Sequence, residues 1–226
     1  MPIPEHPTTR DKLFMAGIKI FAQKGYSGAT VRANCQEAGA ANATAINYYF
    51  GGKEKTYMTI LDMIFAENLK RRQELRAQQN GLVVSPEEQL RNYLRITVEV
   101  IFSGGPLADD ITAILLRELV SPSAHLDALV DSYTRMDDEE LKGIVRDILG
   151  PDMPEYLVRD SMVSVAGQLF YYLAFWPIFS RVNPDHPGIS NYKEPLVDHV
   201  MRFSMAGLEA IRTAWRKGEL PARQHE

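Results

Sequence analysis

The spacing of apolar residues is the feature that most restricts the folds open to this chain. Phe14, Ile18 and Phe21 stand at positions i, i+4 and i+7, and the lysines around them fall off that stripe. This period is typical of an amphipathic helix, and it recurs in almost every segment between successive glycines and prolines. No segment alternates convincingly as a strand does. The sequence therefore predicts an all-α fold of about nine helices.

Local signals predict where those helices begin and end. Thr30 can cap a helix that Gly39 ends, and Asn42 can cap a short helix, from about 43 to 50, that a Gly-Gly pair ends. Ser85, followed by a proline and by a glutamate three residues on, is typical of a helix start. The later predicted helices run from about 85 to 103, 109 to 120, 126 to 148, 155 to 182, with a kink at Pro177, and 193 to 217.

Charge is divided unevenly along the chain. The formal net charge of -4 by itself argues against a nucleic-acid partner. Residues 1–76, however, hold 11 lysines and arginines against 7 acidic residues, whereas residues 77–226 hold 14 against 22. Such an asymmetry can mark a nucleic-acid-binding segment. The N-terminal part is therefore the candidate for contact with DNA.

Other features indicate a cytoplasmic protein without a cofactor. A single cysteine, Cys35, which we expect to be a small buried residue, cannot form an internal disulfide. No uninterrupted apolar run approaches the ~18 residues of a membrane span, and the N-terminus lacks the pattern of a signal peptide. The five histidines are scattered without metal-ligand spacing. We expect no membrane partner, no metal, no cofactor and no catalytic residues.

Residues 30–55, TVRANCQEAGAANATAINYYFGGKEK, are the most informative stretch. Two short helices joined by a tight, glycine-containing turn are typical of a helix-turn-helix, whose second helix enters the major groove of DNA. Small side chains at Ala43, Thr44 and Ala45 would let that helix approach the bases, and Asn47 can hydrogen-bond to a base edge. A plain helical hairpin is the alternative.

The helix starts in this stretch offer unpaired backbone amides to a phosphate group. Thr30, Asn42 and Lys53 stand at such starts, and Lys53 adds a positive charge. The hydroxyls of Tyr48 and Tyr49 can reach phosphate oxygens. The predicted DNA contacts are Thr30, Arg32, Asn42, Ala43, Thr44, Asn47, Tyr48, Tyr49 and Lys53.

The segments FAQKGYSGATVRANCQEAG and INYYFGGKEKTY, within residues 21–57, resemble the N-terminal domain of the TetR family of bacterial one-component transcriptional regulators. The resemblance covers about residues 10–60. It implies a homodimer that binds a roughly palindromic double-stranded DNA operator and releases it when a small-molecule effector binds. With it we expect a helix-turn-helix DNA-binding domain at 8–55, a ligand-binding and dimerisation domain at 56–217 and a tail at 218–226.

Two features depart from the family pattern. Asn34 stands where the family usually places an aliphatic residue on the inner face of the second helix, which predicts a polar group in a small core. The stretch from Gly39 to Tyr48 is one residue longer than is common, which leaves the register of Asn42 to Thr44 open by one position.

The remaining sequence resembles the ligand-binding domain of the CecR-type branch of that family, in residues 115–130, 164–175 and 196–211. In this family the last two long helices usually pair with those of a second subunit as a four-helix bundle. Small residues would permit close approach and aromatic residues would bury apolar area. The predicted dimer residues are Ala166, Gly167, Tyr171, Phe203, Ala206 and Gly207.

A ligand cavity is expected in the same C-terminal part. For its aromatic residues, ordinary core packing is the alternative. Arg117 can face an anionic ligand or pair with an acidic neighbour. The acidic run 137–140 is interpreted as a solvated face, and the basic run 70–72 as phosphate contacts or an exposed helix end. The candidate pocket residues are Phe102, Leu115, Arg117, Met162, Phe170 and Phe175.

These features predict a ligand-responsive transcriptional regulator, in the first place a repressor, rather than an enzyme. An all-helical enzyme and a protein-binding adaptor are the alternatives. The chain shows no nucleophile paired with a base, no metal motif and no phosphate-binding loop. An adaptor would have no need of the pattern at residues 30–55.

Overall fold

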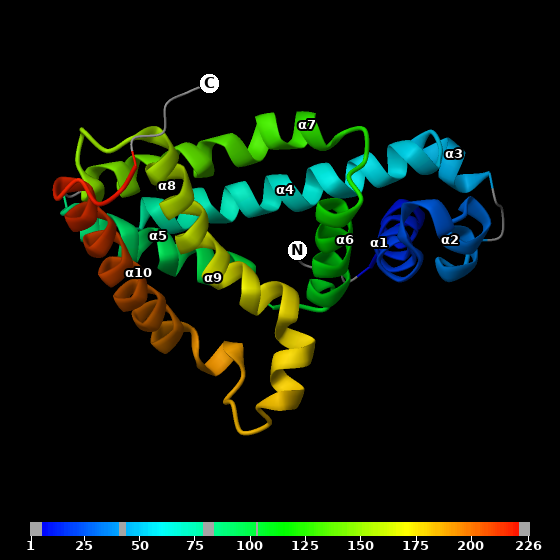
Figure 1. Ribbon diagram of the computed structural model, residues 1–226. Coiled ribbons are helices and arrows are strands. Elements are labelled where there is room, and N and C mark those ends of the chain that lie inside the picture. Colours follow the sequence, from blue (N-terminus) through cyan, green and yellow to red (C-terminus); the bar gives the residue numbers. More distant parts are fainter. Residues whose placement is uncertain (1–5, 41–43, 79–83, 103, 222–226) are drawn as a thin grey trace. The chain divides into compact units, whose positions relative to one another are not determined.

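The computed structural model describes residues 6–40, 44–78, 84–102 and 104–221 (Figure 1). Within these ranges every regular element is helical, which confirms the predicted all-α class. Backbone contacts divide the chain into two compact units. The first comprises residues 1–71 and 104–134, and the second comprises residues 72–103 and 135–226.

The first unit begins with α1 (Thr9–Gly28) and α2 (Val31–Glu37). Gly25, the predicted end of the first helix, has a φ of 66° and interrupts the helical geometry inside α1. The hydroxyl of Thr30 accepts a hydrogen bond of 3.1 Å from the amide of Ala33, so the predicted cap of the second helix is confirmed.

The third helix, α3 (Ala45–Phe50), begins with Thr44 at its N-cap position. Asn42 and Ala43, the predicted cap and first residue of this helix, lie outside the described residues. The helix ends at Gly51, whose φ of 75° lies in the left-handed region that glycine adopts without strain. α4 (Lys53–Ala77) follows, and the boundary between the two units falls within it, after Arg71.

Three further elements complete the first unit: α6 (Ala108–Val120), α7 (Leu126–Leu129) and the π-helical turn η1 (Val130–Thr134). α6 packs against α1. Ile114 of α6 therefore belongs to the same buried cluster as Phe21 and Tyr57. The compact unit around the N-terminal helices is thus larger than the predicted DNA-binding domain of residues 8–55.

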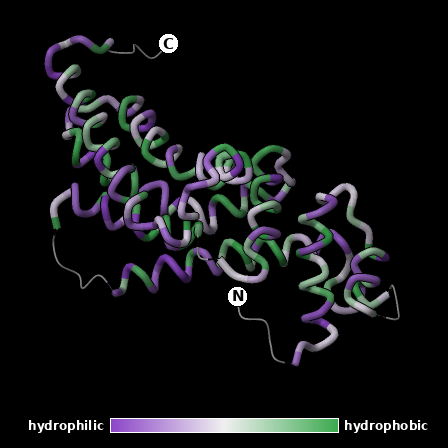
Figure 2. Tube along the Cα trace, turned by 90° about the horizontal axis from the view of Figure 1, so that it is seen from below, coloured by the Kyte–Doolittle hydropathy of each residue, from purple (hydrophilic) through white to green (hydrophobic). Residues whose placement is uncertain are grey.

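The second unit is built around α5 (Pro86–Ile101), α8 (Arg135–Leu149), α9 (Glu155–Val182) and α10 (Lys193–Arg216), with a short 3-10 turn, η2 (Ile189–Asn191). α5 packs against α8 and α10. The elements α7, η1 and α8 follow one another without a break. If these three are counted as one helix, and the short turn η2 is left out, the described residues contain nine helices. Hydrophilic and hydrophobic stretches recur along the helices, as an amphipathic period predicts (Figure 2).

α9 leaves much of its apolar surface exposed. The helix runs through Pro177, and its ribbon changes direction in the C-terminal part that contains this residue (Figure 1). An 18-residue window of α9 has a mean hydropathy of 1.4, yet only 11% of that window is buried inside the chain. By length and composition alone this helix could cross a membrane. Val158, Val165 and Leu169 are buried in the core of the second unit, whereas large apolar side chains on the rest of the helix, such as Val163 and Ile178, are exposed.

Candidate nucleic-acid interface

α3 separates its side chains cleanly into an inner and an outer face. Ile46 and Phe50 are buried with Leu13 and Cys35 in a small core beneath the helix. The burial of Cys35 agrees with its expected role. The outer face holds the predicted DNA contacts Thr44, Asn47, Tyr48 and Tyr49, all of them exposed.

The two tyrosines of this face stand out because they are large and uncovered. Tyr48 is 83% exposed, and its ring contacts that of Tyr49 edge-on, with the ring centroids 4.9 Å apart. Tyr49 is 39% exposed, so the two rings together form a small aromatic patch on the outer face of α3. The hydroxyls are polar groups that suit a hydrated or phosphate-bearing partner.

Helix starts near this face supply candidate anchors for phosphate. Thr30 is exposed at the start of α2, and Arg32 is exposed in the first turn of that helix. Lys53 is the first residue of α4, where the amides at the helix start suit an anion. Its Nζ lies 4.5 Å from the centroid of the Tyr26 ring and 3.5 Å from the carbonyl oxygen of Ser27. These contacts hold the ammonium group close to the helix start.

Asn34 is buried in the N-terminal helices, as its place in the sequence predicts, with 4% of its surface exposed. Its Oδ1 has no hydrogen-bond partner among the described residues. The amide lies close to Gly17, where an added Cβ would stand 3.0 Å from Nδ2. A buried polar group without a partner destabilises the folded state.

Two charged residues of α6 contact the N-terminal helices. Glu118 accepts a hydrogen bond of 2.7 Å from the hydroxyl of Tyr57, and the adjacent Arg117 donates one of 3.4 Å to the carbonyl oxygen of Gln23. Arg117 also covers Gly25, where its Nη1 is 3.3 Å from the position of an added Cβ. The hydrogen-bond partner of Arg117 is therefore a backbone oxygen of α1, and no acidic residue among the described ones forms an ion pair with it. In the sequence, two adjacent charged residues inside the apolar run of α6 were the signal that these side chains need partners.

The acidic run at 137–140 is only partly the solvated face that the sequence predicts. Asp137 forms ion pairs with Arg72 at 2.6 Å and with Arg76 at 2.7 Å, and Glu140 also pairs with Arg76. Asp138 remains exposed. The guanidinium group of Arg72 also lies over the ring of Tyr93. Arg72 therefore stabilises the second unit internally and is not an exposed residue. Lys70 and Arg71, the other two residues of the basic run, are exposed, as one of the two predictions for this run expects.

The six predicted pocket residues lie in different units. Leu115 and Arg117 belong to α6 in the first unit. Phe102 and Met162 pack against the core of the second unit. The remaining two, Phe170 and Phe175, lie on α9 and are 42% and 46% exposed.

The six predicted dimer residues lie on α9 and α10, and the large ones among them are exposed in the single chain. Phe203 is 67% exposed and Tyr171 is 50% exposed. A Cβ added at Gly167 or Gly207 would meet nothing within 4 Å. The surface thus combines large apolar side chains with open backbone.

The exposed helix α3 is the second helix of a helix-turn-helix, and a helical body follows it, an arrangement typical of helix-turn-helix proteins that bind DNA. Residues 86–208 match the family described as the C-terminal domain of the HTH-type transcriptional dual regulator CecR. The chain belongs to the TetR family of transcriptional regulators, with a C-terminal domain of the CecR type.

Individual relatives agree with this assignment. The HTH-type transcriptional repressor NicS of Pseudomonas putida is 27% identical over 154 residues, which is 68% of each chain. The TetR family regulator PfmR of Thermus thermophilus has a similar structure, with a TM-score of 0.60 and 18% identity over 85% of this chain and 98% of that one. FadR of Bacillus subtilis, solved in complex with stearoyl-CoA, has a TM-score of 0.58 and 14% identity over 84% of this chain and 96% of that one. These two structures show a shared fold.

Proposed function

We propose that this protein is a ligand-responsive transcriptional repressor of the cytoplasm that binds a pseudo-palindromic operator as a homodimer and releases it when a small molecule binds. The exposed face of α3 is the observation that carries the proposal. Tyr48 is 83% exposed beside Tyr49, a second exposed tyrosine, and DNA bound to this face would cover both rings.

Each subunit would insert the α3 face, beginning near Thr44, into a major groove. Asn47 would meet base edges, and Tyr48 would donate a hydrogen bond from its hydroxyl to a phosphate oxygen. Thr30, Arg32 and Lys53 would hold the register on the backbone. Asn42 and Ala43, which lie outside the described residues, stay predicted contacts on the sequence alone.

Dimerisation would cover the exposed apolar face of α9 and α10. Phe203 and Tyr171 offer apolar area, and Gly167 and Gly207 leave room for a neighbouring helix. A two-fold dimer presents its two recognition helices about one turn of DNA apart, ~34–36 Å or a multiple, and this spacing accounts for a pseudo-palindromic site. Membrane insertion of α9 is the competing use of the same surface.

Release by a ligand requires two states of the protein that bind DNA differently. A ligand that shifts the population from 1:99 to 99:1 must prefer one state by about 10⁴-fold. The repressor named among the relatives supports repression, and the acyl-CoA complex of FadR supports control by a small molecule in a protein of this fold.

Fluorescence anisotropy with the DNA upstream of the protein's own gene tests the proposal. We expect saturable binding in the nanomolar range that is much tighter than binding to random duplex and that weakens steeply with salt. Tyr48→Phe and Lys53→Ala should each weaken binding, whereas Lys217→Ala, at an exposed lysine near the C-terminus, should not. Equal affinity for random DNA would exclude specific recognition.

A further inference from the structure

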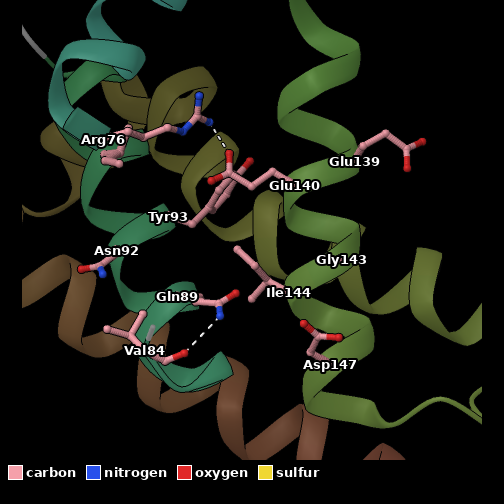
Figure 3. A pocket seen from close by; sticks show the side chains of 11 residues that line it. Arg76, Val84, Gln89, Asn92, Tyr93, Glu139, Glu140, Gly143, Ile144 and Asp147 are labelled. Carbon is pink, nitrogen blue, oxygen red and sulfur yellow. Dashed lines mark hydrogen bonds and ion pairs between the residues drawn. The ribbon is translucent and has the colours of Figure 1, made fainter. Parts of the chain in front are cut away.

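A cavity of about 400 Å³ lies within the second unit, among the end of α4, the first turns of α5 and the middle of α8 (Figure 3). Cavities of ~300–1,000 Å³ are the size that holds small organic ligands. None of the six pocket residues predicted from the sequence lines this cavity. It is therefore a separate candidate for a ligand site, with its own chemistry.

The inner wall of the cavity is apolar. Tyr93, Ile96 and Ile144 line it and are 9%, 3% and 6% exposed. Gly143 of α8 lines it as well, and a Cβ added there would meet nothing within 4 Å. A flat or branched apolar group can therefore lie against the tyrosine and isoleucine side chains.

The one cation among the described residues that line the cavity is already neutralised. Arg76 pairs with Asp137 at 2.7 Å and with Glu140, and the dashed line in Figure 3 marks the second of these contacts. An anionic ligand would have to displace one of these two carboxylates. The Arg76 end of the cavity is thus a poor place for a negative charge.

The opposite end of the cavity carries an unneutralised carboxylate. Asp147 lines this end from α8, where it is exposed at the rim of the cavity, and it makes no ion pair with any residue that the structure describes (Figure 3). Across from it, Gln89 uses its Nε2 to donate to the carbonyl oxygen of Val84 at 3.1 Å, so its Oε1 is left as an acceptor. Glu139 also lines the cavity, but its side chain points away and pairs with Lys142 at 3.7 Å.

We infer that this cavity binds an organic cation, whose ammonium group pairs with Asp147 and donates to Gln89 while its apolar or aromatic body lies against Ile144 and Tyr93. A protonated amine supplies the donors and the positive charge that these two acceptors lack. Binding of the cation does not depend on the proposed function. Only its role as the effector that controls operator binding rests on that function.

Isothermal titration of the full chain with three matched probes tests the inference. 2-Phenylethylamine is a cation at neutral pH, 3-phenylpropanoate is an anion and 2-phenylethanol is neutral, and all three have similar shapes. We expect the amine to bind and the other two to bind at least about ten-fold more weakly, the loss typical of a missing charge-assisted hydrogen bond. Equal or tighter binding of the anion would overturn the inference.

Two variants place the amine in this cavity. Asp147→Asn should lower the affinity for 2-phenylethylamine about ten-fold or more, whereas Asp138→Asn, an exposed aspartate of α8 outside the cavity, should leave it unchanged. Gly143→Leu should also weaken binding, since Gly143 lines the cavity and a Cβ added there would meet nothing within 4 Å. Equal effects of the two aspartate variants would mean that the amine responds only to overall charge and would refute the site.

Measurements of operator binding and of amine binding on the same protein distinguish failure of this inference from failure of the proposed function. If the operator is bound but 2-phenylethylamine is not bound at millimolar concentration, the cation site is wrong and the regulator stands. If the amine binds through Asp147 while operator affinity is unchanged, the site is supported and its role as effector is excluded.

Discussion

The hydroxyl of Tyr57 donates a 2.7 Å hydrogen bond to Oε1 of Glu118, a residue that is only 3% exposed. Oε2 of the same carboxylate accepts the amide of Ser123 at 3.0 Å. The pair joins α4 to α6 inside the first unit. Burial, together with the hydrogen bond to Glu118, raises the pKa of the Tyr57 hydroxyl, so it stays protonated and remains a donor at any pH near neutrality.

Removing the hydroxyl of Tyr57 should destabilise the first unit. Tyr57→Phe leaves a buried carboxylate oxygen without its donor, which costs ~1–3 kcal/mol in the free energy of unfolding. Urea denaturation of the full chain measures this loss. Tyr48→Phe removes a hydroxyl from an exposed ring and should change the free energy of unfolding by less than about 0.5 kcal/mol. Similar losses in the two variants would contradict the importance of the Tyr57 to Glu118 bond.

Lys53 should contribute one phosphate contact per subunit. A dimer of Lys53→Ala would then neutralise two phosphates fewer, and the slope of log affinity against log salt would become less steep by about 2. Operator titrations at several salt concentrations measure the slope. Lys217→Ala serves as the matched control because it removes a lysine far along the chain, on the last turn after α10. A slope unaltered by Lys53→Ala would remove this residue from the phosphate contacts.

Gly167 should be essential to dimerisation while being dispensable for folding of the subunit. Gly167→Glu adds a side chain where a single chain has open space, so the helix content by circular dichroism should be unchanged. In a closely packed four-helix bundle the same side chain would be buried and charged, and the dimer should dissociate. Sedimentation velocity reports the mass. Gly143→Glu, at an equally open glycine of α8, should remain dimeric, and a dimeric Gly167→Glu would place the interface elsewhere.

The ion pair between Arg91 of α5 and Asp198 of α10 should make stability sensitive to acid. The hydrogen bond from Arg91 holds the pKa of the Asp198 carboxyl below its ordinary value of 3.8. The folded state therefore favours the ionised form, and the stabilisation is fully present above the ordinary pKa and is lost as pH falls through the lowered one.

Comparison of the wild type with Asp198→Asn checks the acid dependence. The wild type should be the more stable of the two by a constant margin from about pH 7 to about pH 5, and the margin should shrink as pH approaches about 3. Urea midpoints at each pH measure it. A margin that grows on acidification would show the opposite sign of the pKa shift.

Much of the helical pattern was predictable because its signals are local. Thr30 caps α2 through an amide three residues away, and Gly51 ends α3 through its own backbone conformation. Glu155 and Val182 were predicted as the ends of α9 and are its ends. The burial of Asn34 was expected from the resemblance to the TetR family, which places this position on the inner face of a short helix. The caps and helix ends depend only on residues within a turn or two of one another.

Long-range partners were not predictable in the same way. The run at 137–140 has the composition of a solvated face, but Asp137 meets Arg72 and Arg76, which come from a distant helix. The sequence predicted that Arg117 binds an anionic ligand or forms an ion pair. Its guanidinium group instead donates a hydrogen bond to the carbonyl oxygen of Gln23 in α1. Composition shows that a charge needs a partner, whereas only the packing of helices shows which partner it meets.

The sequence by itself determined the all-helical class, the position of the helix-turn-helix and the family, because periodicity, caps and a dense local motif require no knowledge of distant contacts. Only the tertiary structure decided that α6 packs with α1, that α9 leaves much of its apolar surface exposed and that Asp147 lines a cavity without an ion-pair partner among the described residues. These properties arise where segments far apart in the chain converge, and the free energy of that convergence is spread over many side chains rather than encoded in any one stretch.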